Sequence, residues 1–138
     1  MKYIIILILS LLSFHLHSQT YDLNIKIKNI KKIDGRLEIA IYNKSETFLV
    51  KGKALKVYSL EVNNNTNFLT IKNLPKGEYA IAIYHDLNSD YQCNKNMFGL
   101  PSEAYGFSTN FKPIISKPSF DDCKIYIDNS KSIEIALL

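Results

Sequence analysis

Apolar and polar residues alternate along most of the chain after residue 20, a period of two that is typical of strands with one buried face. The alternation is clearest where Leu23, Ile25 and Ile27 are separated by polar side chains. On this pattern we predict strands at residues 21–28, 36–43, 55–62, 68–74, 78–84, 125–127 and 133–137.

The segments between and within these strands indicate how the strands are arranged. Asp34 and Gly35 suit a tight turn, so we expect the first two strands to pair in antiparallel orientation. Residues 45–53 are mostly polar around Phe48 and predict a crossing loop that places this ring in the core. Residues 78–84 carry little charge on either face, which indicates a strand in the centre of a sheet.

The number and spacing of the predicted strands indicate an all-β fold, since no segment has the pattern of a long helix. We expect a β-sandwich of about seven antiparallel strands, although the pattern also fits a closed barrel. Residues 84–120 lack a hydrophobic period and are rich in Asp, Asn, Gly, Pro and aromatic residues, so we expect one long ordered loop there. The predicted core contains Leu23, Ile25, Leu37, Ile39, Ile81, Ile83, Ile125 and Ile135.

The first 18 residues have the three parts of a secretory signal peptide. A charged start at Lys2 precedes the apolar run of residues 4–12, and a short polar stretch ends at Ser18. The apolar run is about half of the roughly 20 residues that a membrane-spanning helix needs, so we do not expect a retained anchor. Residues 1–18 should be removed, and residues 19–138 should fold as a single domain, exported to the periplasm or the extracellular space.

The charge of the exported part does not indicate nucleic-acid binding. Once Lys2 is removed, 16 Lys and Arg residues remain against 13 Asp and Glu residues. Basic residues are scattered, and their local cluster between residues 26 and 32 fits a solvated strand edge. A nucleic-acid backbone needs a concentrated basic face, so no nucleic-acid partner is expected.

The two cysteines, Cys93 and Cys123, lie in the part that we expect to be exported, where an oxidising compartment permits a disulfide. Closing a loop of this length would stabilise the fold by roughly 3.5 kcal/mol. The alternatives are that Cys123 is a small buried side chain ahead of a strand and that Cys93 is an exposed thiol. The sequence leaves the pairing open.

Side chains with oxygen atoms occupy every second position from Asp86 to Asn94. This spacing resembles the start of a calcium loop, in which alternate residues turn their oxygens toward one cation. One interpretation is therefore a calcium site made by Asp86, Asn88 and Asp90, with Glu103 as a further ligand if the chain folds back. The alternative is that these side chains hydrogen-bond the backbone of their own loop as Asx-turns.

Catalytic residues are harder to identify in this sequence. His85 and Cys93 could be imagined as a base and a nucleophile, but the sequence specifies no orienting group and no oxyanion donor. The carboxylates of the loop offer no reason to select two of them for glycoside chemistry. A hydrolase with a site assembled from residues 84–120 therefore stays the alternative function.

The chain resembles the bacterial domain-of-unknown-function family 2141 in the segments LPKGEYAIAIYHDLNSD, FGLPSEAYGFS and KPSFDD. The resemblance implies an exported β-sandwich of the transthyretin-like or immunoglobulin-like kind, with no settled activity. In the family pattern, Gly stands where this chain has Tyr91 and Ala104, and Asp is usual where it has Asn94. These changes weaken the calcium interpretation, because they remove an anionic ligand and restrict the backbone of the turn.

These observations predict an exported, non-enzymatic binding or structural domain that presents a loop rich in Asp, Asn and aromatic residues. Its expected partner is an envelope or extracellular ligand, either a protein or a glycan, since aromatic rings beside Asn and Asp suit both kinds of surface. The alternative is that most of these rings form a small additional core that holds the loop on the sandwich.

Overall fold

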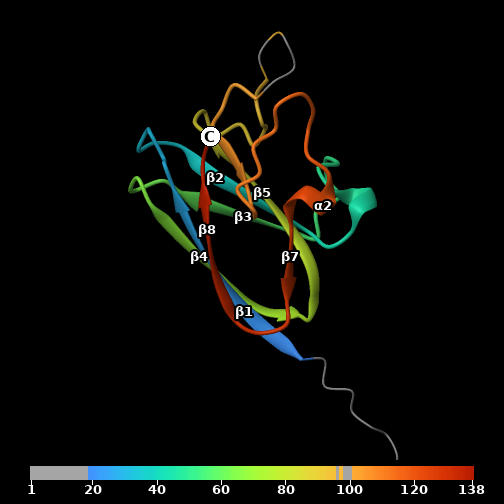
Figure 1. The fold of residues 1–138 in the computed structure, drawn as a ribbon. Coiled ribbons are helices and arrows are strands. Elements are labelled where there is room, and N and C mark those ends of the chain that lie inside the picture. Colours follow the sequence, from blue (N-terminus) through green and yellow to red (C-terminus); the bar gives the residue numbers. More distant parts are fainter. Residues whose placement is uncertain (1–18, 96, 98–100) are drawn as a thin grey trace, which may run out of the picture.

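The structure, a computed structural model, describes residues 19–95, 97 and 101–138, so the predicted signal peptide lies outside the described residues. Two β-sheets pack face to face, which confirms the predicted all-β sandwich (Figure 1). The smaller sheet has the order β4 (Asn67–Pro75), β1 (Thr20–Lys28) and β8 (Lys131–Ala136). The larger sheet has the order β3 (Lys56–Glu61), β2 (Arg36–Tyr42), β5 (Gly77–Asp86) and β6 (Tyr105–Phe107), and β7 (Lys124–Ile127) also pairs with β5.

The main core lies between the two sheets and follows the period of two. Of the eight residues predicted for it, all but Ile125 are buried. Ile125 is half-buried and packs against this core from β7, which pairs with β5 alone, whereas Ile127 on the same strand is fully buried. The alternation therefore located the core correctly, with one exception at a sheet edge.

The predicted hairpin between the first two strands is wrong. β1 pairs with β4 in antiparallel and with β8 in parallel orientation, whereas β2 pairs with β3 and β5. The connection between them crosses from one sheet to the other, with positive φ angles at Asn29 and Gly35. Hydrophobic alternation identifies the strands but not which strands pair with one another. Because β1 and β8 pair in parallel orientation, the sandwich is also not purely antiparallel, in contrast to the prediction.

Strand β5 is central in its sheet, as its low charge predicts. Along one edge it pairs with β2, and along the other edge it pairs first with β7 and then with β6. Strand β6 lies within the stretch that was expected to be one long loop. This stretch is therefore two loops, of residues 87–104 and 108–119, and the prediction of a single loop is corrected.

A second cluster covers the outer face of the larger sheet. It contains Phe48, which follows the short 3-10 helix η1 (Ser45–Thr47), and Phe120 of the helical turn α2 (Phe120–Cys123). The Phe48 ring stacks edge-on against Tyr42 and Phe120, with centroids 5.3 and 5.9 Å apart. The predicted crossing loop is wrong, because this segment joins the neighbouring antiparallel strands β2 and β3 of one sheet. Phe48 is buried as predicted, but its ring packs on the outer face of the sheet rather than between the sheets.

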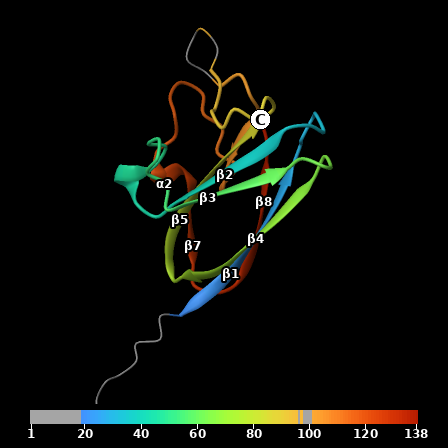
Figure 2. The same ribbon diagram turned by 180° about the vertical axis from the view of Figure 1, so that it is seen from behind.

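Both loops lie at the end of the sandwich opposite Gln19 (Figures 1 and 2). The C-terminal end of β8 reaches the same end. Within the part of the chain that the structure describes, no helix has the length and apolarity needed to cross a membrane.

Candidate functional site

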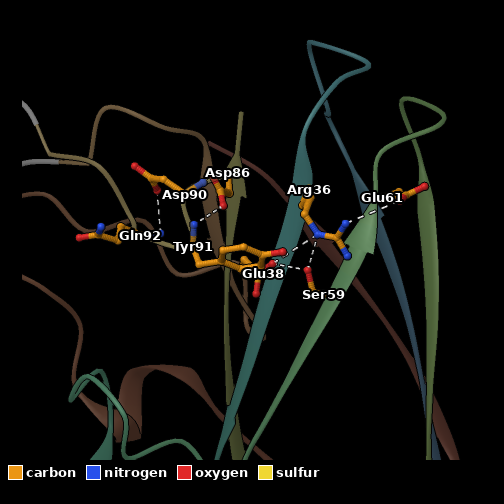
Figure 3. Close-up of polar contacts among 8 residues, drawn as sticks. All are labelled: Arg36, Glu38, Ser59, Glu61, Asp86, Asp90, Tyr91 and Gln92. Atoms are coloured by element: carbon orange, nitrogen blue, oxygen red, sulfur yellow. Dashed lines mark hydrogen bonds and ion pairs between the residues drawn. The ribbon is translucent and has the colours of Figure 1, made fainter. Parts of the chain in front are cut away.

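The 87–104 loop begins at Asp86, the last residue of β5, whose side chain is fully buried. Its two carboxylate oxygens accept hydrogen bonds from the backbone N–H groups of Asp90 and Tyr91, at 3.2 and 2.7 Å (Figure 3). Gly35 packs against the backbone at this point: it has a φ of 70°, and a Cβ on it would lie 2.3 Å from the Asp86 carbonyl oxygen. The start of the loop is therefore fixed on both sides.

The next carboxylate, Asp90, organises the turn itself. One of its oxygens accepts the Gln92 backbone N–H at 2.8 Å, and the other accepts the side-chain amides of Asn88 and Asn94 at 2.9 and 3.2 Å. Desolvation opposes the charge of Asp90, but these three hydrogen bonds outweigh it and hold the pKa of Asp90 below its ordinary value. The turn therefore favours an ionised Asp90.

Glu103 approaches the turn from the far end of the loop and is nearly buried. Its two oxygens accept the backbone N–H groups of Leu87 and Asn94, at 3.2 and 3.0 Å. The chain returns beside the turn, since the Ser102 N–H donates to the Asn94 carbonyl at 2.8 Å. Glu103 was predicted to join the turn if the chain folds back, and the structure brings it there.

The structure thus places Asp86, Asn88, Asp90 and Glu103 around one turn, and every carboxylate oxygen among them accepts at least one N–H donor. This is the arrangement that the Asx-turn interpretation requires. Among the described residues, no three His, Cys, Asp or Glu side chains converge closely enough to hold a metal ion. The calcium site stays a prediction that no contact in the described residues supports.

The backbone of the turn is unusual at Ser89 and Tyr91, whose φ angles are 56° and 59°. Left-handed backbone is unfavourable for a bulky residue and is the conformation that Gly adopts most easily. The Tyr91 side chain is 62% exposed, so packing of its ring does not account for this conformation. The hydrogen bond from the Tyr91 N–H to the buried Asp86 carboxylate accounts for this conformation, because it fixes the orientation of the peptide group.

Glu38 was not among the predicted site residues, because the alternation places it on the face of β2 opposite the core. It is buried in the structure and accepts a hydrogen bond from the Ser59 hydroxyl, which in turn accepts one from Arg36 Nε at 2.7 Å (Figure 3). Arg36 also pairs with Glu61 at 3.6 Å. The sequence offers one signal of this burial, since Tyr42 lies on the same face of the strand and is typical of a face that is partly covered.

Negative charge gathers beneath the loop, on the outer face of the larger sheet. Tyr84 lies opposite Glu38 in the strand register. Burial raises the pKa of Tyr84, and the charges of Glu38, Asp86 and Glu103 raise it further. Tyr84 therefore stays protonated.

His85 and Cys93, the two groups considered for catalysis, lie in separate local environments. His85 is buried, and its Nε2 lies 2.7 Å from the Asp34 carbonyl oxygen, in the connection between the sheets. Burial and the charge of Glu103 raise the pKa of the Cys93 thiol, which disfavours the nucleophilic thiolate. Nothing in these contacts joins His85 to Cys93.

The structure holds Cys93 and Cys123 as free thiols, so the pairing that the sequence left open is not formed in it. Cys123 is buried in the second cluster, and burial raises its pKa to about 12. Cys93 is partly exposed in the loop. Both cysteines match the alternatives to a disulfide.

A family model described as an uncharacterized protein conserved in bacteria, DUF2141, matches residues 25–135. The match spans the sandwich from β1 to β8 and includes the whole turn. No curated protein and no solved structure shows a significant match to the chain.

Proposed function

Since the chain belongs to the DUF2141 family, whose description assigns no activity, we propose its function from the geometry of the turn. The protein is an exported, non-enzymatic binding domain that presents residues 88–92 to a partner in the periplasm or outside the cell. The partner is a neutral or basic surface, either a glycan or a peptide segment, because carboxylates surround the turn.

The observation that carries this proposal is the conformation of Tyr91. A bulky residue with positive φ costs of order 1–2 kcal/mol relative to ordinary backbone, and such residues concentrate at binding and catalytic sites. Here the cost is offset by the hydrogen bond that the Tyr91 N–H donates to the buried Asp86 carboxylate, and the result is an aromatic ring held in solvent. Folding alone gains nothing from an exposed ring in this position.

The composition of the turn suits recognition. Tyr supplies a large rigid contact area with a hydroxyl at its end, and it is enriched among residues that dominate binding energy. Asn88, Asp90 and Gln92 are also exposed and offer both donors and acceptors beside it. The family pattern has Gly at this position, and Gly would form the same backbone without an aromatic ring. We therefore propose that the ring of Tyr91 determines which partner this chain binds.

Calcium has a secondary place in the proposal. A cation bound at Asp90 and Asn88 would stabilise the turn without adding chemistry, and we expect an affinity no better than the weak extracellular range of about 0.1–1 mM. Melting the protein in calcium and in a chelator tests this point. Identical melting temperatures mean that the hydrogen bonds alone hold the turn.

The test of the function compares the wild type with Tyr91→Gly on a glycan array and against immobilised envelope proteins. Gly adopts the backbone of the turn without strain, so the variant keeps its fold and should melt at the same temperature or higher. We expect it to bind at least about tenfold more weakly, as for loss of an aromatic hot spot. Tyr126→Ala, at an exposed position on β7, is the control and should bind as the wild type does.

Unchanged binding by Tyr91→Gly would contradict the proposal. Turnover of an arrayed glycan or peptide, abolished by Asp86→Asn, would instead favour the alternative of a hydrolase.

A further inference from the structure

The loop of residues 108–119 carries an apolar tip that the proposed binding function does not use. Ile114 is 94% exposed and Ile115 is 96% exposed, and the neighbouring Phe111 is 36% exposed. Single exposed apolar residues are ordinary on protein surfaces, but two adjacent isoleucines in almost full contact with water are not. The described chain packs nothing against this tip.

The charged residues within this loop are all positive. Lys112 and Lys117 flank the isoleucines and are exposed, and neither forms an ion pair with a described residue. Residues 109–119 contain no Asp or Glu. An apolar tip between two lysines is complementary to a partner with an anionic outer layer and an apolar interior.

The root of the loop is fixed while its tip projects. Asn110 bonds to β8 through both its side-chain amide and its side-chain oxygen, each at 2.8 Å. On the returning side, the Thr109 hydroxyl donates to the Asp122 carbonyl at 2.7 Å, and Ser119 and Asp122 form a capping box at α2. The loop projects from the end of the sandwich between β6 and α2 (Figures 1 and 2), and both isoleucines on it are almost fully exposed.

From these observations we infer that the 108–119 loop docks the domain on the surface of an anionic lipid bilayer, with Ile114 and Ile115 inserted and Lys112 and Lys117 at the headgroups. A projecting tip of this size is far smaller than a stable protein interface, whereas a fluid bilayer adapts to a convex shape. The lysines supply the attraction to anionic lipid, and the isoleucines supply the insertion. Docking by so few residues is reversible.

The test uses the exported protein as the cell processes it, with vesicles of phosphatidylglycerol and phosphatidylethanolamine or of phosphatidylcholine alone. Co-sedimentation with the anionic vesicles should exceed that with the neutral vesicles by about tenfold, because two lysines lie at the surface. The double variant Ile114→Ser, Ile115→Ser should lose roughly tenfold or more in partitioning. Phe68→Ser, at a 71% exposed position on β4, should partition as the wild type does.

A fluorescence reporter makes the geometry of docking testable, since the chain contains no Trp. Ile115→Trp should shift its emission to the blue with anionic vesicles, and Phe68→Trp should not. Three results would overturn the inference: no binding to anionic vesicles, binding that the double variant retains in full, or a wild-type dimer without lipid that the double variant abolishes. The last result would assign the tip to a second copy of the chain.

Discussion

The loops of residues 87–104 and 108–119 leave the same end of the sandwich on either side of β6, and they use their side chains in opposite ways. In the first loop, the carboxylates of Asp86 and Glu103 are buried and each holds two backbone N–H groups. In the second loop, polar groups hold the root, and Ile114 and Ile115 lie in solvent at the tip.

This difference determines how each loop depends on the rest of the molecule. A buried carboxylate must keep its donors, so the first loop can lose its conformation only with a large loss of free energy. The tip of the second loop buries nothing and can be changed at little cost. The first loop is therefore part of the fold, in the sense that its conformation is coupled to the stability of the sandwich. The second loop is only attached to the fold, because the conformation of its tip is not coupled in this way.

The largest expected effect is at the base of the first loop. Gly35→Ala places a Cβ 2.3 Å from the Asp86 carbonyl oxygen at a φ of 70°, so we expect a loss of about 3 kcal/mol or more in the free energy of unfolding. Gly52→Ala is the matched control, because Gly52 has a φ of 73° but no atom within 4 Å of its added Cβ. Urea unfolding should show a loss of only about 1–2 kcal/mol for the control. Equal losses would mean that Gly35 does not support the loop.

Removing the buried carboxylate should have the next largest effect. Asp86→Ala leaves the N–H groups of Asp90 and Tyr91 without an acceptor, at a cost of about 1–3 kcal/mol each. Asp86→Asn keeps one oxygen acceptor and should lose less. A loss below about 1 kcal/mol for Asp86→Ala, measured by the same urea titration, would contradict the view that this loop is part of the fold.

A smaller loss is expected at the root of the second loop. Asp122→Ala breaks the capping box with Ser119 and should cost about 1 kcal/mol. Asp121→Ala removes an exposed ion pair with Lys124 and should change stability by less than about 0.5 kcal/mol. Thermal unfolding of both variants measures the difference, and a greater loss for Asp121→Ala would contradict the assignment of the cap.

The smallest effect is a pH dependence at Asp90. Its pKa in the folded protein lies below the ordinary 3.8, so its contribution to stability is complete above that value and is lost as the pH falls through the folded pKa. Between pH 5 and 7, above the pKa of Asp90 in both the folded and the unfolded chain, the melting temperature of the wild type should exceed that of Asp90→Ala by a constant amount. Below about pH 4 this difference in melting temperature should shrink. A difference that grows on acidification would have the wrong sign.

Much of the fold could be predicted from the sequence, because a period of two depends only on which face of a strand is buried. Leu23, Ile39 and Ile81 show this directly. The pairing of β1 with β8 could not be predicted, since residues 23–28 and 131–136 are far apart in sequence and no local pattern records their register.

The site was predictable in part. Alternate oxygen side chains identified the turn from Asp86 to Asn94, and a chain reversal was enough to bring Glu103 to it. The positive φ of Tyr91 had one signal, the Gly of the family pattern at this position, but the Asp86 acceptor that holds a Tyr in this conformation could not be predicted. Burial of Glu38 was missed for a similar reason: the hydroxyl that donates to it belongs to Ser59 on the neighbouring strand β3.

The most direct test of the central claim is native-state hydrogen exchange in the two loops. The backbone N–H of Tyr91 and that of Asn94 are bound by buried carboxylates, whereas those of Ile114 and Ile115 have no acceptor within the described residues. The first pair should exchange at least about tenfold more slowly than the second, relative to their intrinsic rates, and Asp86→Ala should remove the protection of Tyr91. Equal exchange at all four amides would contradict the claim that one loop belongs to the fold and the other is only attached to it.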